Sequence, residues 1–314
     1  MEVKTQMKKT LKKRTFISAI AMLVVSAIVL TSSTFAWFSM AKRVEVETME
    51  LNITSPDGVQ ISANANAFTT MLTLADIKGE STARWAAYEG NENNFPELLS
   101  PSSSNMYVAR SLPTFYAGSI DDEGYINATQ VANDTTSGYV AFDIFVKVGQ
   151  DQKVYWNETT VTCGDNEDVV SAMRVALVNC GTVAAKSEAA AILAVKPANA
   201  NQNRVVMYEP NSTNHTEASG YADNTTAPDL YITSAFSRRT PTGNGKNIMQ
   251  EGQYAGAALG TRATDANKAS TAYFDALTGI NRVRVYLWME GNDVDCANDV
   301  AGATINFNLV LTIV

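Results

Sequence analysis

Alternation of apolar and polar residues is the strongest pattern in this chain of 314 residues. Four segments show it or are rich in strand-forming residues: 139–148, 173–178, 283–289 and 305–313. The alternating apolar positions are Val140, Phe142, Ile144, Val146 and Val148; Val283, Val285, Leu287 and Met289; and Ile305, Phe307, Leu309, Leu311 and Ile313. Successive side chains of a strand point to opposite faces, so a period of two predicts strands with one buried face. The core of the protein is therefore expected to consist of β-sheets.

Helical patterns are few in comparison with strand patterns. Ala184 to Val195 is the best helix by propensity, and Met71 to Lys78 is a second, shorter candidate. A parallel α/β fold needs recurrent amphipathic helices between its strands, and this sequence lacks them. We predict an all-β fold, an antiparallel β-sandwich or jelly roll formed by residues 55–314. Two stretches rich in Asn, Ser, Thr, Gly and Ala, 64–135 and 199–281, are interpreted as long insertions between core strands.

Another strand is predicted immediately before this domain, within residues 37–54. Its apolar positions change phase near Thr48, which is what a β-bulge of one extra residue produces. Pro56-Asp57-Gly58 then predicts a turn, and Val59 to Ile61 resumes the extended pattern. The apolar positions of the strand are Val44 and Val46 on one face, and Met49, Leu51 and Ile53 on the other.

Residues 1–36 have the order of charge and hydropathy found in export signals. A basic start is followed by an apolar run from Phe16 to Leu30, and the small residue Ala36 precedes Trp37. This order predicts cleavage between Ala36 and Trp37 and a secreted or cell-surface location. The alternative is an uncleaved membrane anchor, although the clean apolar run is short against the roughly 20 residues that span a bilayer.

Charge limits the partners of the exported chain. Removal of residues 1–36 leaves 18 basic and 31 acidic residues, so the formal charge changes from −8 to −13. A negative field of this size opposes binding to nucleic acid and to anionic lipid. Contact with the membrane is therefore expected only through the N-terminal segment.

The cysteines do not predict a disulfide scaffold. Cys163, Cys180 and Cys296 are too few for a fold held by disulfides, and their odd number leaves at least one unpaired within a chain. If a bridge forms, Cys163 with Cys180 is the first choice, because both lie at the ends of predicted strands.

The residues that enzymes use are scarce. The single histidine, His215, lies in a loop rich in Asn and Thr, and the sequence has no His-Glu-x-x-His pattern. The same scarcity argues against Ser-His-Asp and Cys-His nucleophiles, so we predict that the protein is not an enzyme. Trp288 and Tyr286 share a strand face where they are expected to pack against another layer rather than to bind carbohydrate.

One cluster of oxygen ligands makes calcium a candidate cofactor. Its residues are Asp293, Asp295, Asn298 and Asp299, to which Glu290 is a candidate addition. The cluster lacks the Gly and the terminal Glu of an EF-hand loop. The favoured alternative is a turn in which these side chains bond nearby backbone N–H groups.

Four segments resemble exported proteins of Gram-positive bacteria, especially clostridia and their relatives. They are Thr34 to Phe38 at the end of the signal, Ser137 to Lys147, Ser171 to Val178, and Val283 to Cys296. The signal resembles the type processed by the SipW signal peptidase, and through it the chain is similar to the TasA/camelysin family of biofilm-matrix proteins. The resemblance covers about half of the chain and does not extend to the long insertions.

The resemblance implies a jelly-roll-like sandwich that assembles into fibres by strand donation. In TasA-like fibres the mature N-terminal segment adds itself as a strand to the next subunit, and residues 37–54 suit that role. An ordinary first strand of the chain's own sheet remains the alternative. The camelysin members have been associated with metallopeptidase activity, which the single histidine of this chain does not support.

These observations lead to three functional hypotheses, in order of preference. The first is an exported structural protein that assembles with itself or with related fibre subunits on the cell surface or in the biofilm matrix. The second is a monomeric adhesion module that presents residues 64–135 and 199–281 to a ligand. A secreted metallopeptidase is the third and least favoured.

Overall fold

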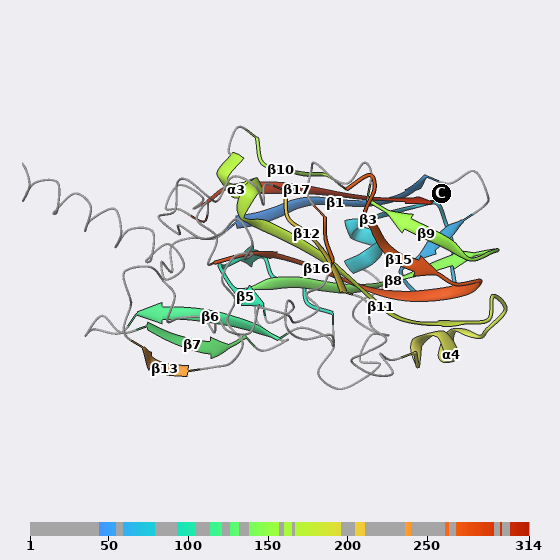
Figure 1. Ribbon diagram of the computed structural model, residues 1–314, viewed down its shortest axis with the longest axis horizontal. Helices are drawn as coiled ribbons and strands as arrows, with labels where there is room; N and C mark the ends of the chain where they lie inside the picture. Colours follow the sequence, from blue (N-terminus) through green and yellow to red (C-terminus); the bar gives the residue numbers. More distant parts are fainter. Residues whose placement is uncertain are drawn as a thin grey trace, which may run out of the picture.

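The structure is a computed structural model in which three β-sheets are stacked as layers (Figure 1). It describes residues 44–54, 59–78, 93–104, 114–120, 126–131, 138–156, 160–164, 167–195, 205–210, 236–239, 261–263, 268–291, 296 and 302–313. Most of these residues lie in strands and only a few in short helices, which confirms the prediction of an all-β protein.

The first layer, which we call the outer sheet, has seven strands. The main strand order is β15-β9-β17-β1-β3, while β10 also pairs with β17 and β4 also pairs with β1. The strands are β1 (Val44–Thr54), β3 (Met71–Thr73), β4 (Leu98–Leu99), β9 (Gln152–Tyr155), β10 (Thr160–Thr162), β15 (Ala272–Ala276) and β17 (Thr304–Ile313). The first and last strands, β1 and β17, lie side by side and run parallel, whereas the other pairs in this sheet are antiparallel.

The second layer is a six-stranded central sheet with the order β14-β12-β11-β16-β8-β2. Its strands are β2 (Gln60–Ser62), β8 (Tyr139–Val148), β11 (Met173–Val183), β12 (Val205–Tyr208), β14 (Thr261–Ala263) and β16 (Gly279–Met289). The segments predicted as strands from their sequence patterns form β8, β11 and β16, which are the three longest strands of this sheet. The pair β12 and β14 is parallel, so antiparallel pairing is the rule with two exceptions.

The third layer, the cover sheet, has the order β13-β7-β6-β5. It consists of β5 (Ser103–Ser104), β6 (Phe115–Ile120), β7 (Ile126–Gln130) and β13 (Phe236–Arg239). All of these strands come from residues 64–135 and 199–281, which also supply β3, β4, β12, β14 and β15 to the other sheets. The interpretation of these stretches as insertions between core strands was therefore incomplete, because their short strands take part in every sheet.

The main core lies between the outer and central sheets. Apolar side chains from β1 and β17 meet alternate side chains of β8, β11 and β16, and most are fully buried. The opposite face of the central sheet is also buried, because every residue of β16 is buried. Both faces of β16 are buried, so its alternation does not mark a solvated face. One face is apolar, and the other contains aromatic and charged residues.

Short helices connect some of the strands. Of the predicted helix from Ala184 to Val195, only α4 (Ala189–Leu193) forms, and α3 (Glu167–Ala172) precedes β11. Within Met71 to Lys78 the first three residues form β3, and the helix is confined to residues 74–78. In the described part of the chain no helix combines the length and the apolar character needed to cross a membrane.

Gly279 at the start of β16 predicts a large effect of a very small substitution. Its φ is +128°, and a Cβ built there would lie 2.1 Å from the backbone oxygen of Val183. We expect Gly279→Ala to lower the free energy of unfolding by about 2–3 kcal/mol, because an L-residue is strained at this φ and the clash is with backbone. Urea denaturation at equilibrium measures the change.

Gly149, in the turn after β8, is the matched control for this substitution. A Cβ at Gly149 would meet no atom within 4 Å, so we expect Gly149→Ala to change stability by no more than about 0.5 kcal/mol. Equal effects of the two substitutions would contradict the close approach of Gly279 to Val183.

Candidate functional site

Several sites predicted from the sequence lie outside the described residues. These are the cleavage site at Ala36 and Trp37, the lone His215, and the calcium candidates Asp293, Asp295, Asn298 and Asp299. Among the residues that the structure describes, no three His, Cys, Asp or Glu side chains are grouped as metal ligands. Glu290 is described: it is fully buried, and its Oε2 accepts a hydrogen bond of 3.1 Å from Nε1 of Trp288. Its carboxylate is therefore engaged inside the protein.

The three cysteines are buried and free, so the structure contains no bridge between Cys163 and Cys180, the pair named as first choice if one forms. Cys163 belongs to the core between the outer and central sheets, where burial raises the pKa of its thiol. The Cys180 thiol donates to the Val178 backbone oxygen within β11. Both cysteines were placed at the ends of predicted strands, and this placement did not show that the two thiols have different surroundings.

The expectation that Trp288 and Tyr286 pack against another layer is confirmed. Both are buried with Tyr139 against Phe115 of the cover sheet. The Phe115 ring stacks on Tyr139 at a centroid distance of 3.9 Å and meets Trp288 edge-on at 5.4 Å. This aromatic cluster, defined by Phe115, Tyr139, Tyr286 and Trp288, attaches the cover sheet to the central sheet.

Beside the aromatic cluster, the same face of the central sheet contains a buried charged cluster. Oδ2 of Asp143 on β8 lies 2.6 Å from the Arg282 guanidinium and 3.3 Å from that of Arg284, both on β16. The Arg284 Nε donates to the Tyr286 hydroxyl, whose pKa is raised, mainly by burial. Such charges are stable inside a protein only when paired, so Asp143, Arg282 and Arg284 depend on one another within the central sheet.

The predicted assembly strand is β1, and the structure places residues 44–54 in the chain's own outer sheet. Residues 37–43, the other part of the expected donor segment, lie outside the described residues. The predicted bulge is confirmed by a register shift between Val46 and Thr48 in the pairing of β1 with β17. The apolar positions behave as a core face: Val44, Met49 and Leu51 are buried, and Val46 and Ile53 are partly buried.

The outward face of the β1 and β17 pair carries polar side chains that bond across the strands. Thr48 donates its hydroxyl hydrogen to Oδ1 of Asn306, and Asn52 donates to Oδ1 of Asn308. These pairs join positions that are more than 250 residues apart in the sequence. Cross-strand contacts of this kind fix the register of β1 against β17.

The other edge of β1 is only partly covered. On this edge β4 pairs with Val44 and Glu45, and β3 pairs with Glu50 to Asn52, both antiparallel. In the described ranges no strand pairs with Val46 to Met49 on the same edge. A four-residue interval of strand edge therefore lies between two short partner strands.

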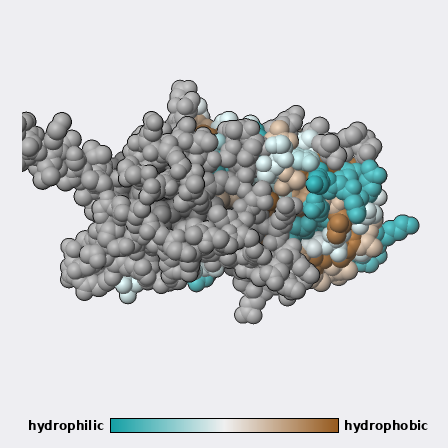
Figure 2. All heavy atoms as spheres, in the orientation of Figure 1, coloured by the Kyte–Doolittle hydropathy of each residue, from teal (hydrophilic) through white to brown (hydrophobic). Residues whose placement is uncertain are grey.

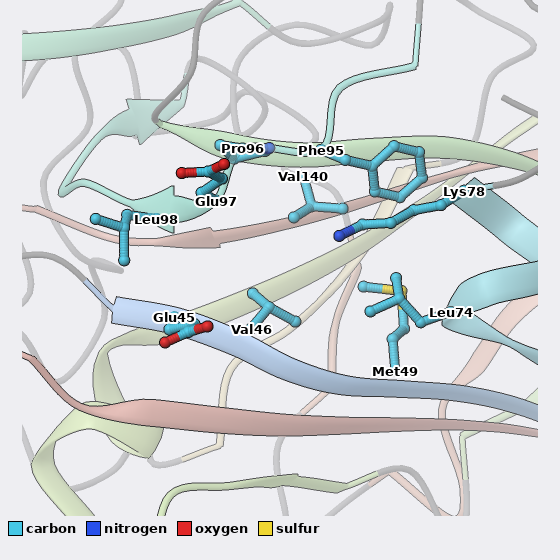
Figure 3. A pocket seen from close by; sticks show the side chains of 10 residues that line it. All are labelled: Glu45, Val46, Met49, Leu74, Lys78, Phe95, Pro96, Glu97, Leu98 and Val140. Atoms are coloured by element: carbon cyan, nitrogen blue, oxygen red, sulfur yellow. The ribbon is translucent and has the colours of Figure 1, made fainter. Parts of the chain in front are cut away.

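A pocket of about 400 Å³ opens beside this uncovered interval. Figure 3 shows that Val46 and Met49 of β1 face Phe95 and Val140 across it. Its remaining wall residues are Glu45, Leu74, Lys78, Pro96, Glu97 and Leu98. Its volume lies within the range of ligand pockets, seven of its ten wall residues are apolar and the other three are charged, and we call it the β1 pocket.

The sequence did not reveal most of this pocket. Six of its ten wall residues come from 64–135, a stretch without a clear strand period. Phe95 lies in this wall because its ring stacks on Phe142 of the central sheet, with centroids 5.8 Å apart. The only available signal was the phase change near Thr48, which marks where the edge of β1 becomes irregular.

Elsewhere the described surface is a mixture of small apolar and polar areas (Figure 2). Hydrophilic residues border the apolar ones on the visible face, and many atoms of this view belong to residues that the structure does not describe. Large apolar side chains exposed in the described part are Met71 and Leu277, which are 51% and 50% accessible. The β1 pocket with the adjacent strand edge is therefore our candidate functional site.

Comparisons of the chain with models of protein families, with curated proteins and with solved structures find no match. The functional interpretation accordingly depends on the sequence patterns and on the geometry of the outer sheet.

Proposed function

We propose that the protein is an exported structural protein that assembles on the cell surface or in the extracellular matrix. The observation that carries the proposal is the place of β1, whose pairing partner β17 comes from the opposite end of the described chain. Support also comes from the export-type signal, the strand-rich fold and the resemblance to fibre-forming matrix proteins. The role is not enzymatic, and a signal peptidase of the SipW type is the expected partner during export.

Assembly by strand donation is compatible with this arrangement as an exchange of β1 between subunits. The strand is the first of the described elements, so its exchange moves one end of the chain and leaves the other strands in place. An exchanged β1 makes the same contacts with β17 of a neighbour that it makes within its own chain. Head-to-tail exchange that does not close into a ring extends into a filament. We also propose that the outer and central sheets form a jelly-roll-like sandwich.

Electron microscopy of the exported form, Trp37–Val314, is the first test. We expect regular filaments at high protein concentration and their loss when residues 37–54 are deleted, because the deletion removes the donated strand. All described elements lie within Trp37–Val314. Discrete monomers at every concentration would contradict self-assembly by this chain alone.

A disulfide reporter distinguishes exchange from pairing within one chain. Thr48 and Asn306 are cross-strand partners whose side chains contact each other, so Thr48→Cys with Asn306→Cys places two thiols side by side. In exchanged filaments we expect oxidation to give a ladder of covalent oligomers on a non-reducing gel. A crosslinked monomer from intact filaments would show that β1 stays in its own chain, and the Thr48→Cys variant alone is the matched control.

The second candidate, a surface-binding module, is favoured by one observation, the β1 pocket. Most of its wall comes from residues 64–135, one of the two stretches expected to present a contact surface. Ligand binding by the monomer distinguishes the two functions, because only a binding module retains specific ligand binding without assembly.

A further inference from the structure

The β1 pocket combines apolar side chains with a strand edge whose backbone groups are turned toward it. The Ile53 N–H donates to Thr70 on the β3 side, so alternation places the Met49 N–H on that side as well. The Glu45 N–H donates to Ala303 on the β17 side, which places the Val46 N–H on the opposite, open side. The bulge between Val46 and Thr48 is the reason that both N–H groups point toward the uncovered edge.

The strands on either side of the uncovered interval define the direction of an incoming strand. Both β3 and β4 run antiparallel to β1 on this edge, one ending and the other beginning at the interval. A segment that continues their line is therefore antiparallel to β1 and about four residues long. Residues just before Val44 do not reach the interval by a tight hairpin, because β4 occupies the edge at Val44 and Glu45. None of the described segments of this chain lies along the interval, so we take the occupant to be a segment of another chain.

The charges around the β1 pocket select one kind of occupant. Glu45 and Glu97 are exposed and lie at the end of the pocket near β4, and Lys78 enters from the opposite end (Figure 3). A strand antiparallel to β1 has its C-terminal end beside the two carboxylates, where a basic side chain is favoured. Without residues 1–36 the chain carries a formal charge of −13, so its field favours a basic protein over an acidic one as the partner.

We infer that the β1 pocket binds an extended segment of a basic partner protein as an added strand antiparallel to β1. Apolar side chains at alternate positions of the segment face Val46, Leu74 and Phe95, and a Lys or Arg near its C-terminal end contacts Glu45 and Glu97. Backbone bonds to β1 supply affinity, and the pocket and the carboxylates supply specificity. This inference goes beyond fibre assembly, because it concerns the free edge of β1 and not the edge paired with β17.

Fluorescence anisotropy with Trp37–Val314 and a labelled peptide, Thr-Val-Thr-Val-Thr-Lys, tests the inference. We expect saturable binding that weakens about three- to tenfold with Glu97→Lys, since an attractive pair at the pocket rim becomes repulsive. A second peptide, in which Glu replaces the terminal Lys, should bind the Glu97→Lys variant more tightly than it binds the unsubstituted protein. Glu188→Lys is the control: it makes the same charge change at an exposed residue before α4 and should leave binding unchanged.

A second probe separates strand pairing from attraction between charges. Replacement of the second valine of the peptide by proline removes a backbone N–H, so we expect binding at least about tenfold weaker at the same peptide charge. Equal affinity for the valine and proline peptides, or no saturable binding at millimolar peptide, would overturn the proposal. Self-association of Trp37–Val314 that Glu97→Lys abolishes would replace the basic partner by a second copy of this chain.

Discussion

Asp143→Ala is expected to lower the free energy of unfolding by about 3–5 kcal/mol. The substitution removes the carboxylate that both Arg282 and Arg284 contact inside the central sheet. These guanidinium groups are at most 2% exposed, so neither reaches water to replace the lost partner. Denaturation followed by both far-UV circular dichroism and tryptophan fluorescence measures the loss and tests whether unfolding is two-state.

Two variants control for this result. Asp143→Asn keeps the shape and one acceptor oxygen but removes the charge, so we expect a smaller loss than with Ala. Glu47→Ala removes an exposed carboxylate from β1, and we expect a change within about 0.5 kcal/mol. A loss of less than about 1 kcal/mol for Asp143→Ala would contradict the buried pairing.

Trp288→Ala is expected to cost about 3–5 kcal/mol and to loosen the cover sheet. The side chain is fully buried, contacts Phe115 of β6 and donates to the buried carboxylate of Glu290. The substitution leaves a cavity between two layers and removes a hydrogen-bond donor from a buried carboxyl group. Hydrogen exchange should show faster exchange in β6 and β7 than in β17, because only the cover sheet is attached through this cluster.

Trp288→Phe separates the contribution of packing against Phe115 from that of the hydrogen bond to Glu290. It keeps a ring against Phe115 but has no N–H for Glu290, so its cost measures the hydrogen bond with little loss of packing. Combining Trp288→Phe with Glu290→Gln should recover part of that cost, since the remaining buried group is then neutral. Equal acceleration of exchange in all three sheets would contradict local attachment of the cover sheet by Trp288.

The sequence was a good guide to the long strands and a poor one to the third layer. Apolar residues recur at every second position over most of β8, β16 and β17, and the bulge in β1 appeared as a change of phase near Thr48. The cover sheet was missed because β6 and β7 consist of short segments with Gly, Ala, Asn and Thr. Such strands depend on contact with the central sheet, here through Phe115, more than on their own pattern.

The candidate site was predictable only in its β1 half. Val46 and Met49 belong to a recognisable strand, but the opposite wall depends on where residues 74–78 and 95–98 fold back. The charged cluster was hidden for a similar reason: Arg284 occupies the position of a solvated residue in an alternating strand and is in fact covered. Periodicity shows which residues share a face and does not show what covers that face.

The pairing of β1 with β17 sets when this protein completes its folding. Thr48 and Asn306, which contact each other, are 258 positions apart. The outer sheet therefore forms only after the last ten residues of the described chain have been synthesised, and its assembly pays the entropy of closing almost the entire polypeptide into one loop. Contacts between residues so far apart in the sequence predict slow folding. Until β17 of its own chain is in place, β1 can pair with β17 of another molecule through the same residues.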